Sequence, residues 1–279
     1  MERNRSQSNV VKLCRVYGVS SSGFYAWRNR EVSAHRVQDV RLMSAIKEIH
    51  QGFRRTYGAR RVYQVLRSTG YECSIRRVNR LMRELGIDAR TTRLYPWRPG
   101  LHAFYSSVEN YLPKVGDPQR ISTQWAGDLT YIKTQKGHVY MAIVMDLFSR
   151  KIVGWSFSQT RDAQCTKSAL RAALNRQQPE KGCLFHSDQG AEYAAYEYRD
   201  YLKASGLVQS MSRKATPQDN AKVESFFHTL KGELIYKRTY KNSYEVIADI
   251  MEYISFYNYE RLHSSLNYQS PEDYEKLSA

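Results

Sequence analysis

The chain has 279 residues and a mass of 32.6 kDa, and 42% of its residues are hydrophobic, which is enough for two or three domains with buried cores. Its net charge of +16, from 43 Lys and Arg against 27 Asp and Glu, predicts a polyanionic partner. It lacks a run of about 18 apolar residues and the pattern of a signal peptide, so we expect no membrane span and a cytoplasmic location. The four cysteines are widely spaced and do not match the ligand spacing of a zinc site, so we expect reduced, buried thiols.

The positive charge is concentrated in the first part of the chain. Residues 1–122 contain 23 Lys and Arg against 9 Asp and Glu, a net charge of +14, whereas residues 123–279 carry +2. Twenty of those 23 basic residues are Arg, whose planar guanidinium suits bidentate contact with phosphate. We therefore interpret the first part as the nucleic-acid-binding part and the remainder as the part that performs chemistry. The alternative is an Arg-rich surface that is only solvated.

Residues 1–32 are predicted to form an N-terminal helix-turn-helix segment. Val10, Leu13, Cys14 and Tyr17 follow helical spacing, and the following glycine breaks the pattern before a second short helix. The outline is that of a helix-turn-helix, although many small helical pairs share it.

Residues 33–88 form a second, better marked unit of the helix-turn-helix kind. Helices are predicted over about 36–50, 59–68 and 75–85, with Ser74 as the N-cap of the last. One face of that last helix is apolar, and the other is polar and basic. The polar face comprises Arg76, Asn79, Arg80 and Arg83. We expect this face to enter the major groove of DNA, because Arg and Asn suit guanine and adenine edges; a solvated basic face is the alternative. We also expect DNA contact from Arg60 and Arg61.

Residues 89–122 read as a linker, because Pro, Gly and aromatic residues stand among arginines without periodicity. The sequence leaves open whether its aromatic side chains lie on DNA or pack on a neighbouring domain. Residues 123–240 are predicted to form an α/β core, in which a mixed five-stranded sheet is flanked by helices. Residues 241–279 form a helical tail packed on that core. The expected strands are 125–133, 139–146 and 150–158 in an antiparallel meander, then 183–188 and 207–212; the expected helices are 162–176, 191–206, 220–238 and 244–262.

Three acids on separate elements of the predicted core are candidate metal ligands. Asp128 lies in the first strand, Asp188 at the end of the fourth strand, and Glu224 in the first turns of the helix over 220–238. Carboxylate oxygens suit Mg²⁺ or Mn²⁺, and two such ions would catalyse phosphoryl transfer on nucleic acid. Asp146 is interpreted as a structural turn residue, and Asp219 or Asn220 as the cap of the Glu224 helix.

Neighbouring side chains are expected to support these acids. Lys231 and His228 lie on the same side of the helix as Glu224, by helical periodicity. His186 precedes Asp188 by two residues, so strand alternation points both side chains the same way. Either a supporting role beside the acids or a plain packing role fits His186, and the role of His228 stays open.

Several motifs resemble insertion-sequence transposases with a DDE integrase core, of the second-reading-frame (orfB) type found in two-frame bacterial elements. The resemblance covers nearly the whole chain. It includes TYGARR, W-x-x-D-L-T-Y, DLFSRKIVGW, HSDQG, P-x-D-N-A-x-x-E-S-F-F-x-T-L-K-x-E and Y-N-x-x-R-x-H-x-x-L. The thirty-five residues between Asp188 and Glu224 also match the spacing that the family shows.

The resemblance implies a ribonuclease-H-like core with Asp128, Asp188 and Glu224 as catalytic, metal-binding acids and two Mg²⁺ or Mn²⁺ ions per site when DNA is bound. It also implies contact of Lys231 with the element end. The implied reaction is metal-dependent cleavage at insertion-sequence ends and attack of the freed 3′ hydroxyl on target DNA. The implied partners are double-stranded DNA, both terminal inverted repeats and target, and further copies of the chain. The implied location is the bacterial nucleoid.

The chain opens almost directly into its first predicted helix-turn-helix, without the leucine-zipper segment that such transposases obtain from the first reading frame. We therefore expect a first-reading-frame protein or fusion as a further partner. Two other hypotheses share the residues described above. One is a non-catalytic DNA-binding regulator or assembly subunit, and the other is a nuclease acting on RNA–DNA hybrids.

Overall fold

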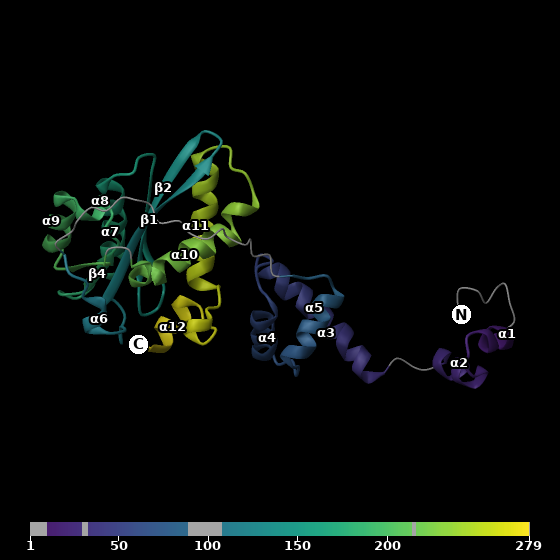
Figure 1. The fold of residues 1–279 in the computed structure, drawn as a ribbon. Coiled ribbons are helices and arrows are strands. Elements are labelled where there is room, and N and C mark those ends of the chain that lie inside the picture. Colours follow the sequence, from purple (N-terminus) through teal and green to yellow (C-terminus); the bar gives the residue numbers. More distant parts are fainter. Residues whose placement is uncertain (1–9, 30–32, 89–107, 214–215, 279) are drawn as a thin grey trace.

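A computed structural model describes residues 10–29, 33–88, 108–213 and 216–278. Figure 1 shows a sheet covered by helices, a three-helix unit beside it, and a helical pair further out. The pair is formed by α1 (Val10–Val16) and α2 (Ser21–Arg28), as predicted. Ser20 caps α2, because its Oγ accepts a hydrogen bond from the Gly23 N–H at 3.0 Å.

The three-helix unit contains the second predicted helix-turn-helix. Its elements are α3 (Ala34–Gly52), α4 (Ala59–Ser68) and α5 (Ile75–Glu84). The apolar faces of these helices meet in one core, in which Ile46, Val62, Leu66 and Val78 are fully buried. Ser74 caps α5 as predicted, and the polar face of α5 lies on the outside.

The predicted mixed sheet of five strands is confirmed. Its strands are β1 (Gln124–Thr134), β2 (Gly137–Asp146), β3 (Ile152–Ser158), β4 (Leu184–Ser187) and β5 (Val208–Met211). Their order is β3-β2-β1-β4-β5, in which the first three form the antiparallel meander and β4 and β5 join in parallel. This arrangement, with helices on both faces, is the ribonuclease-H-like architecture that the family resemblance implies.

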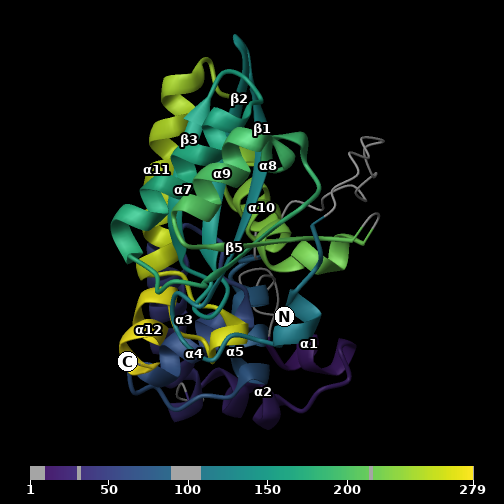
Figure 2. The ribbon, with the colours of Figure 1, turned by 90° about the vertical axis from the view of Figure 1, so that its left-hand side faces the viewer.

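Helices cover both faces of the sheet (Figures 1 and 2). One face packs against α7 (Ala163–Gln177), α8 (Ala191–Ala194) and α9 (Tyr196–Ala204), and the other against α10 (Ala221–Glu233) and α11 (Ser243–Tyr259). Strand alternation explains the division, since Trp125 packs with the first group and Ala126 with the second. Every second residue of β1 therefore faces α10.

The single helix predicted over 191–206 is wrong, because the chain breaks at Ala195 into α8 and α9. Positions five apart on a continuous helix differ by about 140° in direction. The break lets Tyr193 and Tyr198 both pack on Phe185, with ring centroids 6.3 Å and 6.0 Å from it. Burial of two aromatic rings thus overrides the local helical pattern.

The helix predicted over 220–238 is shorter than expected. α10 ends at Glu233, and a 3₁₀ turn over Ile235–Lys237 follows it. The turn redirects the chain so that Ile235 packs in the core with α11. Two short helices, α6 (Leu112–Val115) and α12 (Pro271–Ser278), were not predicted.

The cysteines are free thiols, as expected, and Cys14, Cys165 and Cys183 are buried while Cys73 is half buried. Burial raises the pKa of the Cys183 thiol to about 12, so this thiol stays protonated near neutral pH. In the described part of the chain, no helix is both long and apolar enough to cross a bilayer.

Candidate active site

The three candidate acids come from three elements that pack together. Asp128 lies in β1 between Ala126 and Ile132, which both pack against α10, so strand alternation directs Asp128 to the same side. The parallel register of β1 and β4 pairs Ala126 with His186 and so brings Asp188, just past the end of β4, level with Asp128. Glu224 lies in the first turn of α10.

Backbone N–H groups hold one oxygen of each aspartate. The Leu129 N–H donates to Asp128 Oδ1 at 2.8 Å, and the Gly190 N–H donates to Asp188 Oδ1 at 3.0 Å. A side chain at position 190 would clash, since a Cβ there would lie 2.9 Å from Asp188 Oδ1 and from the carboxyl group of Glu192. A larger residue at position 190 would therefore have to displace one of these two carboxylates.

The three acids influence one another's ionisation. Burial and the charge of Asp188 raise the pKa of Asp128 well above its usual range. Burial also raises the pKa of Asp188, and burial together with the charge of Asp188 raises the pKa of Glu224. Among the described residues, no three His, Cys, Asp or Glu side chains stand in a ready-made metal-binding arrangement. The donor set is nonetheless made of hard oxygens whose mutual repulsion a divalent cation would relieve, and in this respect the residues fit Mg²⁺ or Mn²⁺.

Lys231 lies on α10 with its ammonium directed to β1. Its Nζ donates to Thr130 Oγ1 at 2.8 Å and lies 5.9 Å from the centre of the Tyr131 ring. Burial lowers the pKa of Lys231. The ammonium therefore contacts β1 at Thr130, which is two residues after Asp128. His228, on the same helix, is exposed.

His186 is fully buried and joins β4 to β5. Its Nδ1 lies 2.9 Å from Ser210 Oγ and its Nε2 lies 3.0 Å from Ser212 Oγ. Burial lowers the pKa of His186 to about 4, so the ring is neutral near pH 7. Both ring nitrogens are therefore used to fix the strand that ends at Asp188.

Asp146 has the structural turn role that the sequence predicts. It is fully buried, and its carboxylate accepts hydrogen bonds from the backbone N–H groups of Ser122, Phe148 and Ser149 and from the Trp125 indole. These four donors occupy the oxygens that a metal ligand would need.

A fourth acid at the site was missed from the sequence. Glu192 is buried, and its charge raises the pKa of both Asp128 and Asp188. Arg161 holds it, with Nη2 at 3.0 Å and Nε at 3.3 Å from Glu192 Oε1. The available signal was an acid four positions after Asp188 within the apolar stretch AEYAAY.

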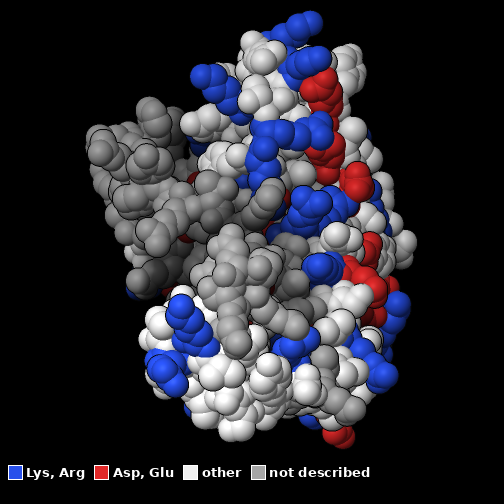
Figure 3. Space-filling model, turned by 90° about the vertical axis from the view of Figure 1, so that its right-hand side faces the viewer, with Lys and Arg blue, Asp and Glu red and all other residues white. Residues whose placement is uncertain are grey.

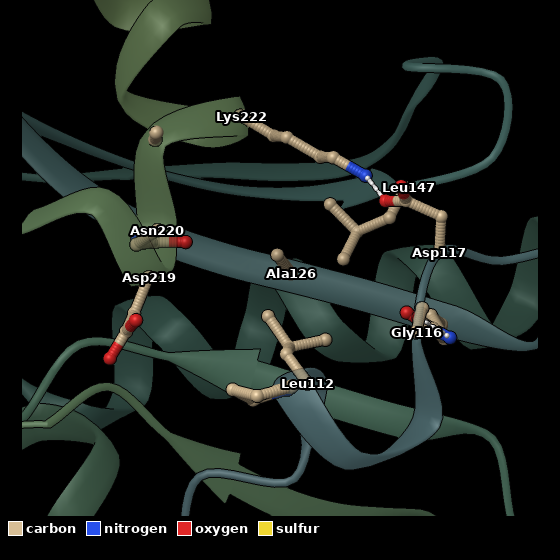
Figure 4. A pocket seen from close by; sticks show the side chains of 11 residues that line it. Leu112, Gly116, Asp117, Ala126, Leu147, Asp219, Asn220 and Lys222 are labelled. Carbon is tan, nitrogen blue, oxygen red and sulfur yellow. Dashed lines mark hydrogen bonds and ion pairs between the residues drawn. The ribbon is translucent and has the colours of Figure 1, made fainter.

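A cavity of ≈ 330 Å³ lies next to the start of α10 (Figure 4). Leu112, Ala126, Leu147 and Asn220 are among the residues that line it, and an ion pair between Lys222 and Asp117, 2.8 Å long, crosses its rim.

The predicted capping of α10 is wrong. Asn220 occupies the N-cap position without a side-chain cap bond, and within the described residues its side-chain amide has no hydrogen-bond partner. The Asp219 carboxylate is instead bound by Arg213.

The predicted DNA-facing side chains of α5 are exposed, but they differ in their surroundings. Arg76, Asn79 and Arg83 lie on the solvent side. Arg80 is also exposed, yet its guanidinium bonds the buried Asp39 at 2.7 Å and Glu84 at 2.6 Å. Figure 3 shows Lys and Arg spread over the described surface on this side of the molecule, with Asp and Glu gathered along one edge.

The two arginines of α4 that were expected to contact DNA also differ in their surroundings. Arg60 is exposed, whereas Arg61 is half buried and directed at the core. Arg61 Nε donates to the Leu262 carbonyl at 3.1 Å. The structure therefore places Arg61 in a contact between the three-helix unit and the core.

Comparisons with known proteins agree with this organisation. An HTH-like domain model matches residues 38–95, and integrase core domain models match residues 118–217 and 205–271. The transposase for insertion sequence element IS904 of Lactococcus lactis is 36% identical over 256 residues, which cover 90% of this chain and 100% of that protein. Transposase InsF for insertion sequence IS3A of Escherichia coli is 34% identical over 279 residues, or 99% of this chain and 96% of that protein. The catalytic core domain of HTLV-2 integrase, solved with magnesium, covers 55% of this chain and 94% of its own with 14% identity and a TM-score of 0.43.

Proposed function

Since the chain belongs to the insertion-sequence transposases with an integrase core, we propose that it cleaves DNA at the ends of an insertion sequence and joins the freed ends to target DNA. The observation that carries this proposal is the convergence of Asp128 in β1, Asp188 just past β4 and Glu224 in the first turn of α10, where the charge of Asp188 raises the pKa of Asp128 and of Glu224. Clustered acids with raised pKa values are typical of catalytic centres that bind cations.

The proposed cofactor is Mg²⁺ or Mn²⁺, with two ions per site when DNA is present. Asp128, Asp188 and Glu224 would hold them, with one oxygen of each aspartate fixed by a backbone N–H and the second oxygen of each as a further possible ligand. When bound, such a pair activates the attacking oxygen and stabilises the leaving oxygen of an in-line displacement. Lys231 Nζ lies beside Thr130, two residues along β1 from Asp128, and would contact a phosphate of the element end there.

The proposed reaction has two displacements at phosphorus. In the first, water attacks a phosphodiester at the element end, the bond from phosphorus to the 3′ oxygen breaks, and a 3′ hydroxyl and a 5′ phosphate result. In the second, that 3′ hydroxyl attacks a phosphodiester of target DNA, loses its proton and forms a new bond to phosphorus, while a target 3′ hydroxyl leaves. Each step exchanges one phosphorus–oxygen bond for another, so the protein needs no covalent intermediate.

The proposed DNA grip lies in residues 1–88, and the chemistry in residues 123–240. Arg76, Asn79 and Arg83 would enter the major groove from α5, and Arg60 would contact the backbone. Arg80 is partly occupied by Asp39 and Glu84, so its share in base contact is smaller than that of its neighbours. We further propose that copies of the chain assemble on the two element ends in the bacterial nucleoid, together with a first-reading-frame protein or as a fusion with it.

Incubation of the chain with labelled double-stranded element ends and Mg²⁺ or Mn²⁺ tests the proposal. We expect nicked and joined products from the parent chain and none from Asp188→Asn or Glu224→Gln. Asp200→Asn and Glu180→Gln are matched controls, because both acids are exposed away from the site, and these variants should cleave like the parent.

Two results would overturn the proposal. Tight end binding with no cleavage under any metal condition, by the chain alone or with a first-reading-frame segment, would favour the regulator or assembly subunit. Cleavage of an RNA–DNA hybrid in preference to element ends would favour a hybrid nuclease.

A further inference from the structure

The three-helix unit of α3, α4 and α5 is seated on the core by residues from three of the sequence motifs. TYGARR contributes Tyr57 and Arg61, the long motif of α10 contributes its last residue, Glu233, and the Y-N-x-x-R-x-H motif contributes Arg261. These four residues, together with Tyr253, are called the Glu233 cluster below. The proposed function assigns no role to any of them, although the sequence predicted that Arg61 contacts DNA.

The centre of the cluster is a buried ion pair. Arg261 Nη2 donates to Glu233 Oε1 at 2.7 Å, and Arg261 Nε donates to Glu233 Oε2 at 3.0 Å, in the bidentate arrangement that favours a fixed geometry. Only 5% of Arg261 and 8% of Glu233 are exposed. The Tyr253 hydroxyl donates to Glu233 Oε2 at 2.8 Å, so both oxygens of this carboxylate are satisfied inside the protein.

The three-helix unit completes the cluster from the other side. Arg61 Nη1 lies 4.0 Å from Glu233 Oε1, and Arg61 Nε donates to the Leu262 carbonyl at 3.1 Å. Tyr57 Oη accepts a hydrogen bond from the Leu262 N–H at 2.9 Å. Arg61 and Tyr57 therefore bind the backbone next to Arg261, and the Leu262 side chain packs into the core of the three-helix unit.

Further residues enlarge this contact between the three-helix unit and the core. Arg54 pairs with Glu252 of α11, and its guanidinium lies 4.9 Å from the centre of the Phe256 ring. Phe53 stacks on Tyr57 with ring centroids 4.3 Å apart and also packs against the core helices. The contact thus has a polar centre and an aromatic rim, and it joins the unit to the core at more than one point.

The contact between the three-helix unit and the core reaches α10, the helix that carries the proposed catalytic acid Glu224. Glu224 and Glu233 are nine residues apart on α10, a distance of about 13 Å along the helix axis. Tyr257, next to the cluster, also packs edge-on against Phe226 of α10 at 4.8 Å. Any tilt of the three-helix unit would therefore have to break contacts with α10 or with the segment that holds it.

We propose that the Glu233 cluster fixes the distance between the DNA gripped by the three-helix unit and the acids, and so selects which phosphodiester is cleaved. This inference rests on the proposed function, because it concerns the position of that cleavage. Tyr57 and Arg61 are positioning residues in this view, since they act through α10 and touch no reacting atom. Their contribution is accuracy of cleavage, with little effect on the affinity for element ends.

Tyr57→Phe and Arg61→Ala in the full chain test the inference, and Tyr57→Phe guards against misfolding because it removes only a hydroxyl group. Arg67→Ala is the matched control, because Arg67 is an exposed arginine on the same helix α4. Amide hydrogen exchange at residues 260–263 reports directly on the contact between the three-helix unit and the core, since the Leu262 N–H donates a hydrogen bond to Tyr57 Oη. A sequencing gel of end-labelled DNA measures where each variant cleaves, and a binding titration without metal measures its affinity.

We expect both variants to exchange faster at residues 260–263 and to bind ends within about twofold of the parent. The ratio of cleavage at the main phosphodiester to cleavage at its neighbours should fall roughly tenfold, the effect of losing one or two hydrogen bonds. Faster exchange with an unchanged cleavage pattern would overturn the inference, and so would unchanged exchange. Absence of metal-dependent cleavage by the parent, both alone and with a first-reading-frame segment, would overturn the proposed function itself, and this inference with it.

Discussion

Replacement of Arg261 by alanine removes the cation that neutralises Glu233 in a buried position. Glu233 would keep its bond to the Tyr253 hydroxyl and lose two charge-assisted hydrogen bonds of 2.7 Å and 3.0 Å. Breaking a buried pair by removal of one partner costs about 3–5 kcal/mol, because the remaining charge stays desolvated. For a protein of about this size, 1 kcal/mol corresponds to about 2–4 °C in Tm, so we expect a fall of roughly 6–20 °C.

Thermal unfolding of Arg261→Ala beside Arg54→Ala measures this effect. Arg54 belongs to the same contact between the three-helix unit and the core, but its partner Glu252 is 71% exposed. A surface pair contributes about 0–1 kcal/mol, so Arg54→Ala should lower Tm by no more than about 4 °C. The double variant Glu233→Leu with Arg261→Met should regain most of the loss, because it leaves no buried charge unpaired.

The pH dependence gives an independent check on the same pair. Arg261 holds the pKa of Glu233 below its ordinary value of 4.5, against the opposing effect of burial. A depressed folded pKa stabilises the protein above pH 4.5, and this stabilisation is lost as pH falls through the folded pKa. The stability gap between parent and Arg261→Ala should therefore narrow on acidification below about pH 4.5. Equal losses in Arg261→Ala and Arg54→Ala at neutral pH, or a gap independent of pH, would refute the reasoning.

Three further predictions concern the site and the DNA grip. Mg²⁺ at ten times its Kd should stabilise the parent by about 1.4 kcal/mol, or roughly 3–6 °C in Tm, and Asp128→Asn should not respond; an equal response would contradict the assignment of this ligand. Arg76→Ala and Arg83→Ala should each weaken binding to element ends by about 1–3 kcal/mol and reduce the preference for the end sequence over unrelated DNA in titrations, whereas an unchanged preference would contradict their placement in the major groove. Burial lowers the pKa of His186 to about 4 in the folded state. As pH falls from 6.5 to about 4, the histidine is therefore protonated in the unfolded state but not in the folded state, which favours unfolding. The parent should lose stability over that range and His186→Gln should lose less, as followed by unfolding midpoints; parallel curves would exclude the histidine as the cause.

Patterns that are local in the sequence predicted most of the fold, and the three acids remain a prediction that the structure brings onto neighbouring elements. Strand alternation and helical spacing identified the five strands and most of the helices, and the residue types and spacing of Asp128, Asp188 and Glu224 indicated their chemistry. Asp146 was separated from the acids because its sequence context is that of a turn, and its backbone donors confirm this interpretation. Such signals are readable because each depends on a few neighbouring residues.

Contacts between distant elements were not readable in the same way. The face of α5 predicts four equivalent polar side chains, yet Asp39 on α3, 41 residues earlier, engages Arg80 and leaves the others exposed. Arg61 looked like its neighbour Arg60, but the chain around Leu262, some 200 residues later, draws it into the core contact. A partner chosen by tertiary packing leaves no periodic trace, so the sequence gives the type of side chain without its use.

The two ends of α10 stand in opposite electrostatic environments, and this contrast bears on how the site is maintained. At the N-terminal end, the charge of Asp188 opposes the ionised form of Glu224. At the C-terminal end, Arg261 and Tyr253 satisfy Glu233, and Lys231 in the last turn ties the helix to Thr130 of β1. The attractive contacts hold α10 against the sheet whatever the protonation of Glu224 is. Movement of α10 therefore does not relieve the repulsion among the three acids. A bound cation would relieve it.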